Sequence, residues 1–278
     1  MGHPVGETCP PAPSEPAHEV LGIPVEQRLL ERWRGWYAPE RQPFPIEGFA
    51  PEAAARLPRG SVEASDEERD TFFLYGGHHV WLSEEEFDRL PRETARELRR
   101  ARRAGMRPKP DPVWPSQLRT DGDDALLAWV EAGCQPSRHR EVPSEVWDDA
   151  AAILPGARRL AGTFPSSGSG ANCFATVLAA AGDTAAVDAW TQIDEFSCWL
   201  EERTVPALGT ERDDAPGTVL VWTERGVLAH AAVTIGGGWA LSKPSQSWSS
   251  PRLVRRVRDT ILDWRFPGTR LHRCSLVR

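Results

Sequence analysis

The sequence predicts an α+β fold on three observations. Helical patterns dominate as far as about residue 203, and strand patterns dominate from Gly217 onward. No glycine signature of a dinucleotide-binding or phosphate-binding loop is present. The chain has 278 residues, of which 40% are hydrophobic and 26% are charged, a composition typical of one or two globular domains.

The N-terminal part divides into two predicted regions. Residues 1–22 are polar, rich in proline and free of aromatic side chains, so we expect a disordered arm there. Residues 23–160 are expected to be mostly helical and irregular. Their first helix covers Ile23–Tyr37, because its leucines and tryptophans fall on one face. The prolines between 39 and 51 then exclude long regular structure.

A hairpin and three helices are expected in the rest of this region. Two short apolar runs around a Gly-Gly turn predict a hairpin over Thr71–Leu82. Ser83 and Glu86 form a capping-box pattern, which predicts the start of a helix that ends near Gly105. Two further short helices are expected at 123–133 and 144–154.

Residues 161–278 are predicted to form a second domain, with helices first and strands after. A Ser/Gly turn at 166–170 leads into a helix of small residues, and a second helix follows. The helices are expected at Ala171–Ala181, Asp183–Arg203 and around 251–262, and the strands at Thr218–Thr223, Val227–Ile235, Trp239–Lys243 and Thr269–Val277. This order predicts helices packed on an antiparallel sheet.

Charge and cysteine content exclude several classes of protein. A formal net charge of −7 argues against a dedicated nucleic-acid-binding protein, which needs a basic surface. No apolar run approaches the roughly 18 residues that span a bilayer, and residues 1–20 show no secretory signal, so we expect a cytoplasmic protein without a membrane partner. Five widely spaced cysteines exclude a disulfide scaffold or a zinc ribbon. Lys109 and Lys243 are the only lysines among 33 basic residues, a bias that indicates a GC-rich bacterial genome.

Cys173 is the strongest candidate for a catalytic residue. It follows the Ser/Gly turn and is expected in the first turn of the small-residue helix. Free N–H groups and the helix dipole at that end favour an anion, so they lower a thiol pKa below its usual ~8.5 and can bind an oxyanion. The alternative interpretation is a buried structural cysteine near a helix start.

His230 is the candidate proton acceptor. It lies in an apolar predicted strand between Ala229 and Ala231, whose small side chains leave room for a second group beside the imidazole. Histidine can take the thiol proton and return it to the leaving group. The alternative is a core histidine whose ring is satisfied by a backbone carbonyl.

These two segments resemble a known family. Residues 168–182, GSGANCFATVLAAAG, are similar to the glycine turn, cysteine and small-residue helix of NlpC-type papain-like cysteine hydrolases. Residues 216–243, PGTVLVWTERGVLAHAAVTIGGGWALSK, resemble the hairpin and histidine-bearing strand that follow in that family. The resemblance covers about 165–278 and implies a papain-like catalytic domain with a Cys-His pair. Asn172 departs from the family's acidic residue, and Phe174–Ala175 replaces its Ser-Gly.

The third catalytic residue stays open. The family has a polar residue on the next strand that orients the histidine, and Ser242, twelve residues after His230, occupies that position. A three-residue loop at Gly236–Gly238 places the two side chains on one face of adjacent strands. A two-residue loop places Lys243 there instead, and a lysine cannot accept from the ring but favours a thiolate. Gln246 on the following loop is a further candidate.

The expected function is that of a cysteine amidase, peptidase or acyl transferase. Cys173 and His230 would form an acyl-enzyme from a peptide-like amide or ester, with Ser242 as the orienting residue. Gln246 and Trp248, in a Ser-rich loop, are expected to bind the substrate. This chemistry requires neither a metal nor a cofactor, and the resemblance implies cell-wall peptides as the family's substrates. The alternatives are a non-enzymatic binding or regulatory protein with a degenerate fold of this type, and an effector or toxin domain.

Overall fold

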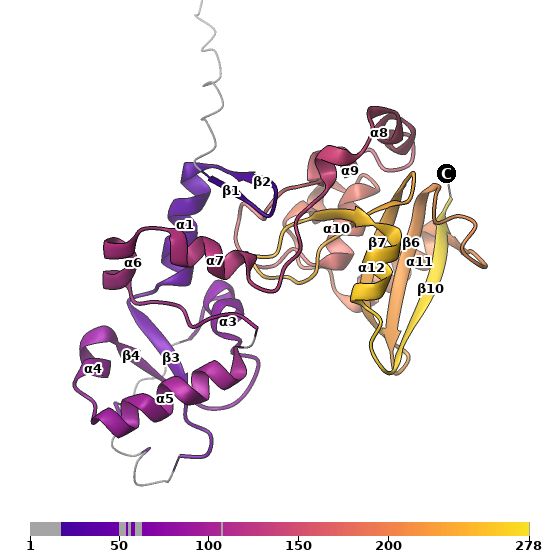
Figure 1. The fold of residues 1–278 in the computed structure, drawn as a ribbon. Coiled ribbons are helices and arrows are strands. Elements are labelled where there is room, and N and C mark those ends of the chain that lie inside the picture. Colours follow the sequence, from indigo (N-terminus) through magenta and orange to yellow (C-terminus); the bar gives the residue numbers. More distant parts are fainter. Residues whose placement is uncertain (1–17, 50–53, 55–56, 59–62, 107, 278) are drawn as a thin grey trace, which may run out of the picture.

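The computed structural model describes residues 18–277 apart from 50–53, 55–56, 59–62 and 107, and over these residues it is a mixed α and β protein. Figure 1 shows helices and short strands in the N-terminal half and a large sheet with its helices in the C-terminal half. The α+β prediction is therefore confirmed.

The N-terminal body combines short helices with two small antiparallel sheets. Its strands are β1 (His18–Val20), β2 (Ile23–Val25), β3 (Arg41–Pro45) and β4 (His79–Ser83), and its helices are α1 (Gln27–Tyr37), α3 (Asp66–Phe72), α4 (Glu84–Asp88), α5 (Arg92–Gly105), α6 (Pro115–Asp121) and α7 (Asp124–Glu131). Strand β1 pairs with β2, and β3 pairs with β4.

The C-terminal body begins with helices and continues with the large sheet. Its helical elements are η1 (His139–Glu141), α8 (Ser144–Ala151), α9 (Ala157–Leu160), α10 (Cys173–Ala180), η2 (Thr184–Val187), α11 (Ile193–Arg203) and α12 (Val257–Asp263). Its strands are β5 (Thr204–Pro206), β6 (Pro216–Glu224), β7 (Val227–Gly236), β8 (Trp239–Ser242), β9 (Leu253–Arg256) and β10 (Thr269–Leu276). Across the described ranges, no helix is both long enough and apolar enough to cross a bilayer.

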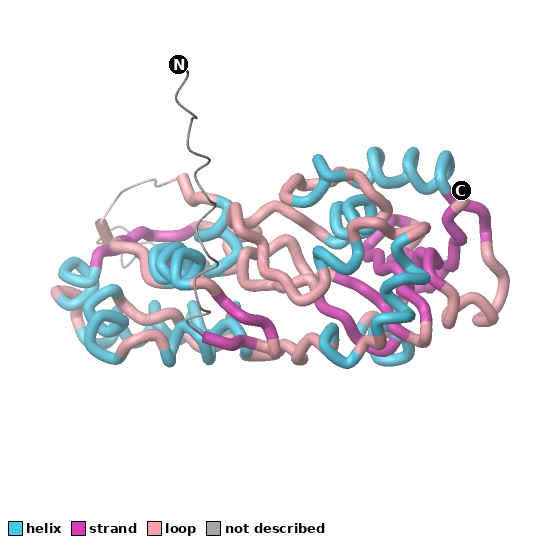
Figure 2. The backbone as a smooth tube through the Cα atoms, turned by 90° about the horizontal axis from the view of Figure 1, so that it is seen from above, coloured by secondary structure: helices cyan, strands magenta, loops and turns pink. Residues whose placement is uncertain are grey.

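The six strands are ordered β5-β10-β6-β7-β8-β9, and every neighbouring pair is antiparallel. Because side chains alternate along a strand, the sheet has two apolar faces. The α10 face contains Val219, Val221, Ala231, Val233 and Leu241, and the α12 face contains Leu220, Trp222, Ala232 and Ala240. Figure 1 shows α10 and α12 on opposite sides of these strands, and Figure 2 shows helices on both sides of the magenta strands of the C-terminal body.

Helix α10 is positioned by its cap and by its small side chains. The Asn172 side chain accepts from the Ala175 N–H at 2.9 Å and donates to the carbonyl of Thr191 at 2.8 Å. All eight residues of the helix are buried. The neighbouring loop approaches so closely that a Cβ atom on Gly156 would collide with the carbonyl oxygen of Ala179. Small residues therefore allow the helix to lie deep in the core.

One hydrophobic cluster joins the two bodies. Trp33 of α1 and Trp129 of α7 pack against Phe164, Trp248 and Leu253 of the C-terminal body. Burial of this much aromatic surface is a large source of stability. The loop after β8, which includes Trp248, is consequently held against the N-terminal helices.

Two N-terminal predictions are wrong in part. Within the predicted arm, residues 18–20 form β1, and Val20 is buried; residues 1–17 lie outside the described part of the chain. The predicted hairpin at 71–82 does not form, because α3 continues to Phe72, residues 73–75 form no strand, and β4 pairs with β3. A capping box between Ser65 and Glu68 starts α3, and this local signal outweighs the apolar run that follows.

The predicted helix from Ser83 starts correctly but is interrupted. Ser83 and Glu86 form the expected capping box, with the Ser83 N–H donating to Glu86 at 2.8 Å. The helix α4 then ends at Asp88, and α5 begins only after Pro91, whose ring nitrogen cannot donate a helical hydrogen bond.

Two C-terminal boundaries also differ from the prediction. The strand β9 occupies the first half of the predicted helix at 251–262, because it adds to the edge of the sheet beside β8. The core of the C-terminal body also begins at Val142 and includes side chains of α8 and α9, well before the predicted boundary at 161.

Candidate active site at Cys173

Cys173 is the first residue of α10 and lies at the α10 face, with 8% of its surface exposed. Burial raises the pKa of its thiol to about 11, although the N–H groups of Ala231, Phe174 and Cys173 itself donate toward the sulfur and Lys243 favours the thiolate. The N–H groups at the helix start lower the pKa, as predicted, but burial outweighs them, so the expected net lowering is wrong. At neutral pH the resting sulfur is a protonated thiol.

His230 is buried on the other side of the sheet. Its strand partner is Trp222, and its ring stacks on Trp264 with the centroids 3.8 Å apart and the planes 8° from parallel. The buried Nε2 atom has no hydrogen-bond partner among the described residues. Burial lowers the pKa of the imidazole to about 3, so the ring is neutral at physiological pH.

The predicted Cys173–His230 dyad is not formed. Ala231 packs in the same core cluster as Cys173, whereas its neighbour His230 lies with the α12 face. Side chains alternate along β7, so the sulfur and the imidazole are separated by the sheet. A histidine between two alanines has the same local pattern on either face, and the sequence alone does not indicate which face it occupies.

Ser242 lies on the α12 face of the sheet, as His230 does. The register pairs Ala232 with Ser242, which places Ser242 diagonally from His230. The turn itself has two residues, since Gly236 pairs with Trp239, and an irregularity between Thr234 and Gly236 gives the register that was expected from a three-residue loop. The alternative in which Lys243 faces His230 is therefore wrong. Because Ser242 also faces away from Cys173, it does not belong to a catalytic set with that sulfur.

Lys243 is the charged residue that the fold brings to Cys173. It follows Ser242, so it projects to the α10 face, and its side chain is fully buried. Its Nζ donates to the carbonyl oxygens of Ser245 at 2.5 Å and Ser247 at 3.0 Å. Burial lowers the pKa of Lys243 well below its ordinary value, with a further lowering from Arg252.

Gln246 is bound within the protein. Its side-chain N–H donates to Asp70 Oδ1 at 3.0 Å and to the Tyr75 hydroxyl oxygen at 2.9 Å, and that hydroxyl donates to Asp70 at 2.5 Å. The predicted role in binding substrate is therefore replaced, in this structure, by a link between the loop after β8 and the N-terminal body.

Trp248 is a core residue, so the prediction that it stacks on a substrate is wrong. Its side chain is fully buried and stacks on Trp129 with centroids 5.4 Å apart. Its indole N–H donates to Thr71 Oγ1 at 2.9 Å. In the sequence, a tryptophan in a Ser-rich loop looks like a surface residue, because the N-terminal helices that cover it are distant in the chain.

Helix α3 covers both loops that flank the Cys173–Lys243 pair. Glu67 accepts from the N–H of Ser169, in the turn before Cys173, at 3.1 Å. Asp70 and Thr71 accept from Gln246 and Trp248 in the loop after Lys243. These contacts join residues more than 100 positions apart, so no local pattern in the sequence predicts them.

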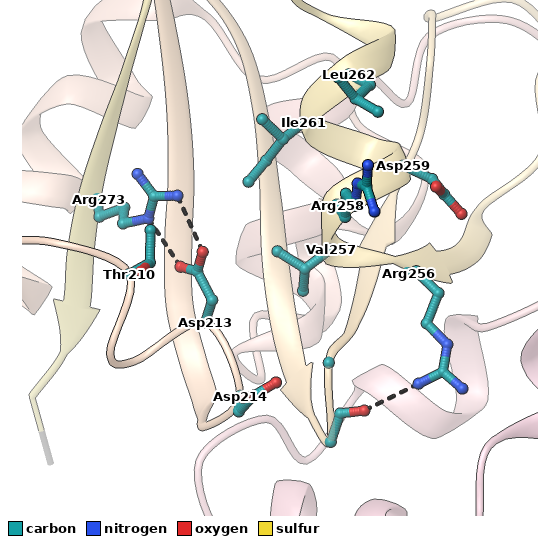
Figure 3. Close-up of a pocket in the computed structure, with 12 residues that line it drawn as sticks. Thr210, Asp213, Asp214, Arg256, Val257, Arg258, Asp259, Ile261, Leu262 and Arg273 are labelled. Atoms are coloured by element: carbon teal, nitrogen blue, oxygen red, sulfur yellow. Dashed lines mark hydrogen bonds and ion pairs between the residues drawn. The ribbon is translucent and has the colours of Figure 1, made fainter.

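A separate cavity of about 630 Å³ lies beside α12, away from Cys173. Figure 3 shows Val257, Ile261 and Leu262 of α12 along one wall and the ion pair between Arg273 and Asp213 on another. The two residues form paired hydrogen bonds of 2.8 and 2.9 Å. Its lining contains no cysteine, serine or histidine nucleophile, so it does not add to the chemistry of the Cys173 site.

Comparisons of the chain with protein-family models, with curated proteins and with solved structures found no match.

The Asn172 cap leads to a prediction for stability. We expect Asn172→Ala to lower the free energy of unfolding by about 2 kcal/mol, because it removes the cap of α10 and leaves the buried carbonyl of Thr191 without its donor. Asn172→Asp keeps the acceptor of the cap but places a buried carboxylate oxygen against the Thr191 carbonyl, so it should also be less stable than the unmodified chain. Urea denaturation of the three proteins measures the difference, and equal midpoints for Asn172→Ala and the unmodified chain would contradict the capping role.

Proposed function

We propose that this protein is a cysteine hydrolase or acyl transferase with a papain-like, NlpC-type C-terminal domain, in which Cys173 attacks an amide or ester carbonyl. The observation that supports it most is the place of Cys173, which is the first residue of the capped helix α10 and packs in one core cluster with Ala231 of the sheet. A helix that starts with the cysteine and packs on an antiparallel sheet agrees with such a domain.

The proposed reaction begins with loss of the thiol proton to a base in the site. The sulfur of Cys173 forms a bond to the carbonyl carbon, and the π electron pair moves to the carbonyl oxygen. Donors at the first turn of α10 stabilise that developing oxyanion. The intermediate collapses to a thioester as the amine or alkoxide leaves with a proton, and water or an amine then takes the acyl group.

A second candidate is the non-enzymatic binding or regulatory protein. It is favoured by the burial of Cys173, which keeps the thiol protonated, and by the placement of His230 and Ser242 on the other face of the sheet. On this interpretation the fold is kept for a partner and the cysteine is structural.

A burst experiment separates the two candidates. Mixing the protein with p-nitrophenyl acetate should release nitrophenolate rapidly, up to one equivalent, with the acetyl group mapped to Cys173 by mass spectrometry. Cys173→Ala should abolish the burst, whereas Cys198→Ala, at an exposed cysteine on α11, should retain it. A wild-type protein without a burst at Cys173 would favour the binding protein.

A further inference from the structure

The burial of Lys243 is unusual for a lysine. Its side chain has no exposed surface, and lysines are almost never fully buried unless they are paired. Among the described residues, no carboxylate lies within ion-pair distance of its amine. The partners of Nζ are the backbone carbonyls of Ser245 and Ser247.

This hydrogen bonding suits a neutral amine. An –NH₂ group has two N–H donors and one lone pair, and the two carbonyl oxygens use the two donors. The lone pair is then free to accept a proton. An ammonium would instead have a third donor and a full charge in a site without a close counter-ion, which is costly.

The charged groups around Lys243 come from three other elements. Arg252, before β9, disfavours the ammonium; Asp70 of α3 and Cys173 of α10 favour it, and burial outweighs both. The effect on Cys173 is reciprocal, because Lys243 favours the thiolate. The two groups therefore rest as a neutral thiol and a neutral amine on the same face of the sheet. A lowered pKa leaves a lysine amine in the neutral form that a general base requires.

We propose that Lys243, and not His230, is the base that takes the proton of Cys173. This inference rests on the proposed function and names the proton acceptor that it requires. The S–H proton moves to the Nζ lone pair as the sulfur attacks the carbonyl carbon. The ammonium of Lys243 then gives this proton to the departing amine or alkoxide, which restores the neutral amine and leaves the thioester on Cys173. His230 stays in its stack with Trp264 throughout.

The first test needs no substrate. The chain has two lysines, so selective ¹³C,¹⁵N labelling of lysine yields two side-chain signals, and Lys109→Met assigns them. Lys109 is a matched control, because its Nζ also donates to two backbone carbonyls, those of Trp129 and Val130. We expect the Lys243 amine to titrate well below its ordinary pKa and its signal to shift in Cys173→Ala, while Lys109 is unmoved. The inference would be overturned by a Lys243 signal that titrates near its ordinary pKa of about 10.4 and has the same chemical shift in Cys173→Ala as in the wild type.

The second test follows the burst with p-nitrophenyl acetate. Lys243→Met should slow thioester formation near neutral pH by on the order of 10²–10⁴-fold. Lys243→Arg should do the same, because a guanidinium does not deprotonate. The deficit of Lys243→Met should shrink toward pH 11, where hydroxide removes the thiol proton directly, a recovery that a purely structural role does not produce. Lys109→Met should react like the wild type.

The outcomes separate this inference from the proposed function. A wild-type burst that both Lys243 variants retain, with an unchanged pH profile, overturns the role of Lys243 and leaves Cys173 as nucleophile. A wild type without a burst rejects the proposed hydrolase, and the lysine signals then decide whether the Cys173–Lys243 pairing exists. Circular dichroism of each variant shows that it is folded before its rate is interpreted.

Discussion

Trp248→Ala is expected to lower the free energy of unfolding by about 3–5 kcal/mol, the cost of a large cavity at a fully buried aromatic position. Trp248 packs on Trp33 and Trp129 and donates to Thr71, so the substitution removes packing in both bodies and takes away the donor to a buried hydroxyl. Urea denaturation followed by circular dichroism measures the change.

The control for this prediction is Trp190→Ala, at a tryptophan that is 43% exposed. Its effect should be small, within roughly 0.5–1 kcal/mol. Because Trp248 joins the N-terminal helices to the C-terminal body, we also expect its loss to split the unfolding transition into two steps. Similar denaturation midpoints for the two variants would show that Trp248 is not the core residue described here.

The elements with strong local signals could be predicted from the sequence. Small residues after a Ser/Gly turn indicated α10, and Ser83 with Glu86 indicated the start of α4. Apolar runs rich in β-branched residues indicated the central strands, within one or two residues of their observed ends. Strand β9 and helix α3 were missed, because the first depends on a free sheet edge and the second on a cap inside an apparently irregular segment.

The candidate site could be predicted only in part. The sequence indicates Cys173 because a cysteine at a helix start has a recognisable chemistry. It does not indicate Lys243 as the partner, since that depends on which face of β8 meets α10. The sequence left the register of β7 with β8 open between two loop lengths. The observed turn has two residues, and an irregularity between Thr234 and Gly236 shifts the register so that Ala232 pairs with Ser242. Burial of Trp248 and Gln246 depends on α3, which is distant in sequence.

His230 leads to the second large expected effect, a loss of stability in acid. Burial lowers the pKa of the folded imidazole to about 3, while an unfolded histidine has a pKa near 6.5. Below about pH 6.5 the imidazole binds a proton in the unfolded chain but stays neutral in the folded chain. The contribution of His230 to stability is therefore complete above this pH and is lost progressively as the pH drops toward 3. The loss approaches about 1.4 kcal/mol per pH unit and amounts to about 2 kcal/mol at pH 5.

The variant His230→Phe tests the direction of this pH dependence of stability. Phenylalanine can keep the stack on Trp264 but cannot bind a proton, so its stability should fall less between pH 7.5 and pH 5, by about 2 kcal/mol. Other titrating groups affect both proteins alike and cancel in the comparison, and His272→Phe, at an exposed position of β10, controls for the added ring. The His230→Phe variant should keep the Cys173 burst, because the imidazole lies across the sheet from the sulfur. If His230→Phe instead slowed the burst by on the order of 10²–10⁴-fold and left the acid sensitivity unchanged, His230 would be the base and its buried stack would not persist in solution.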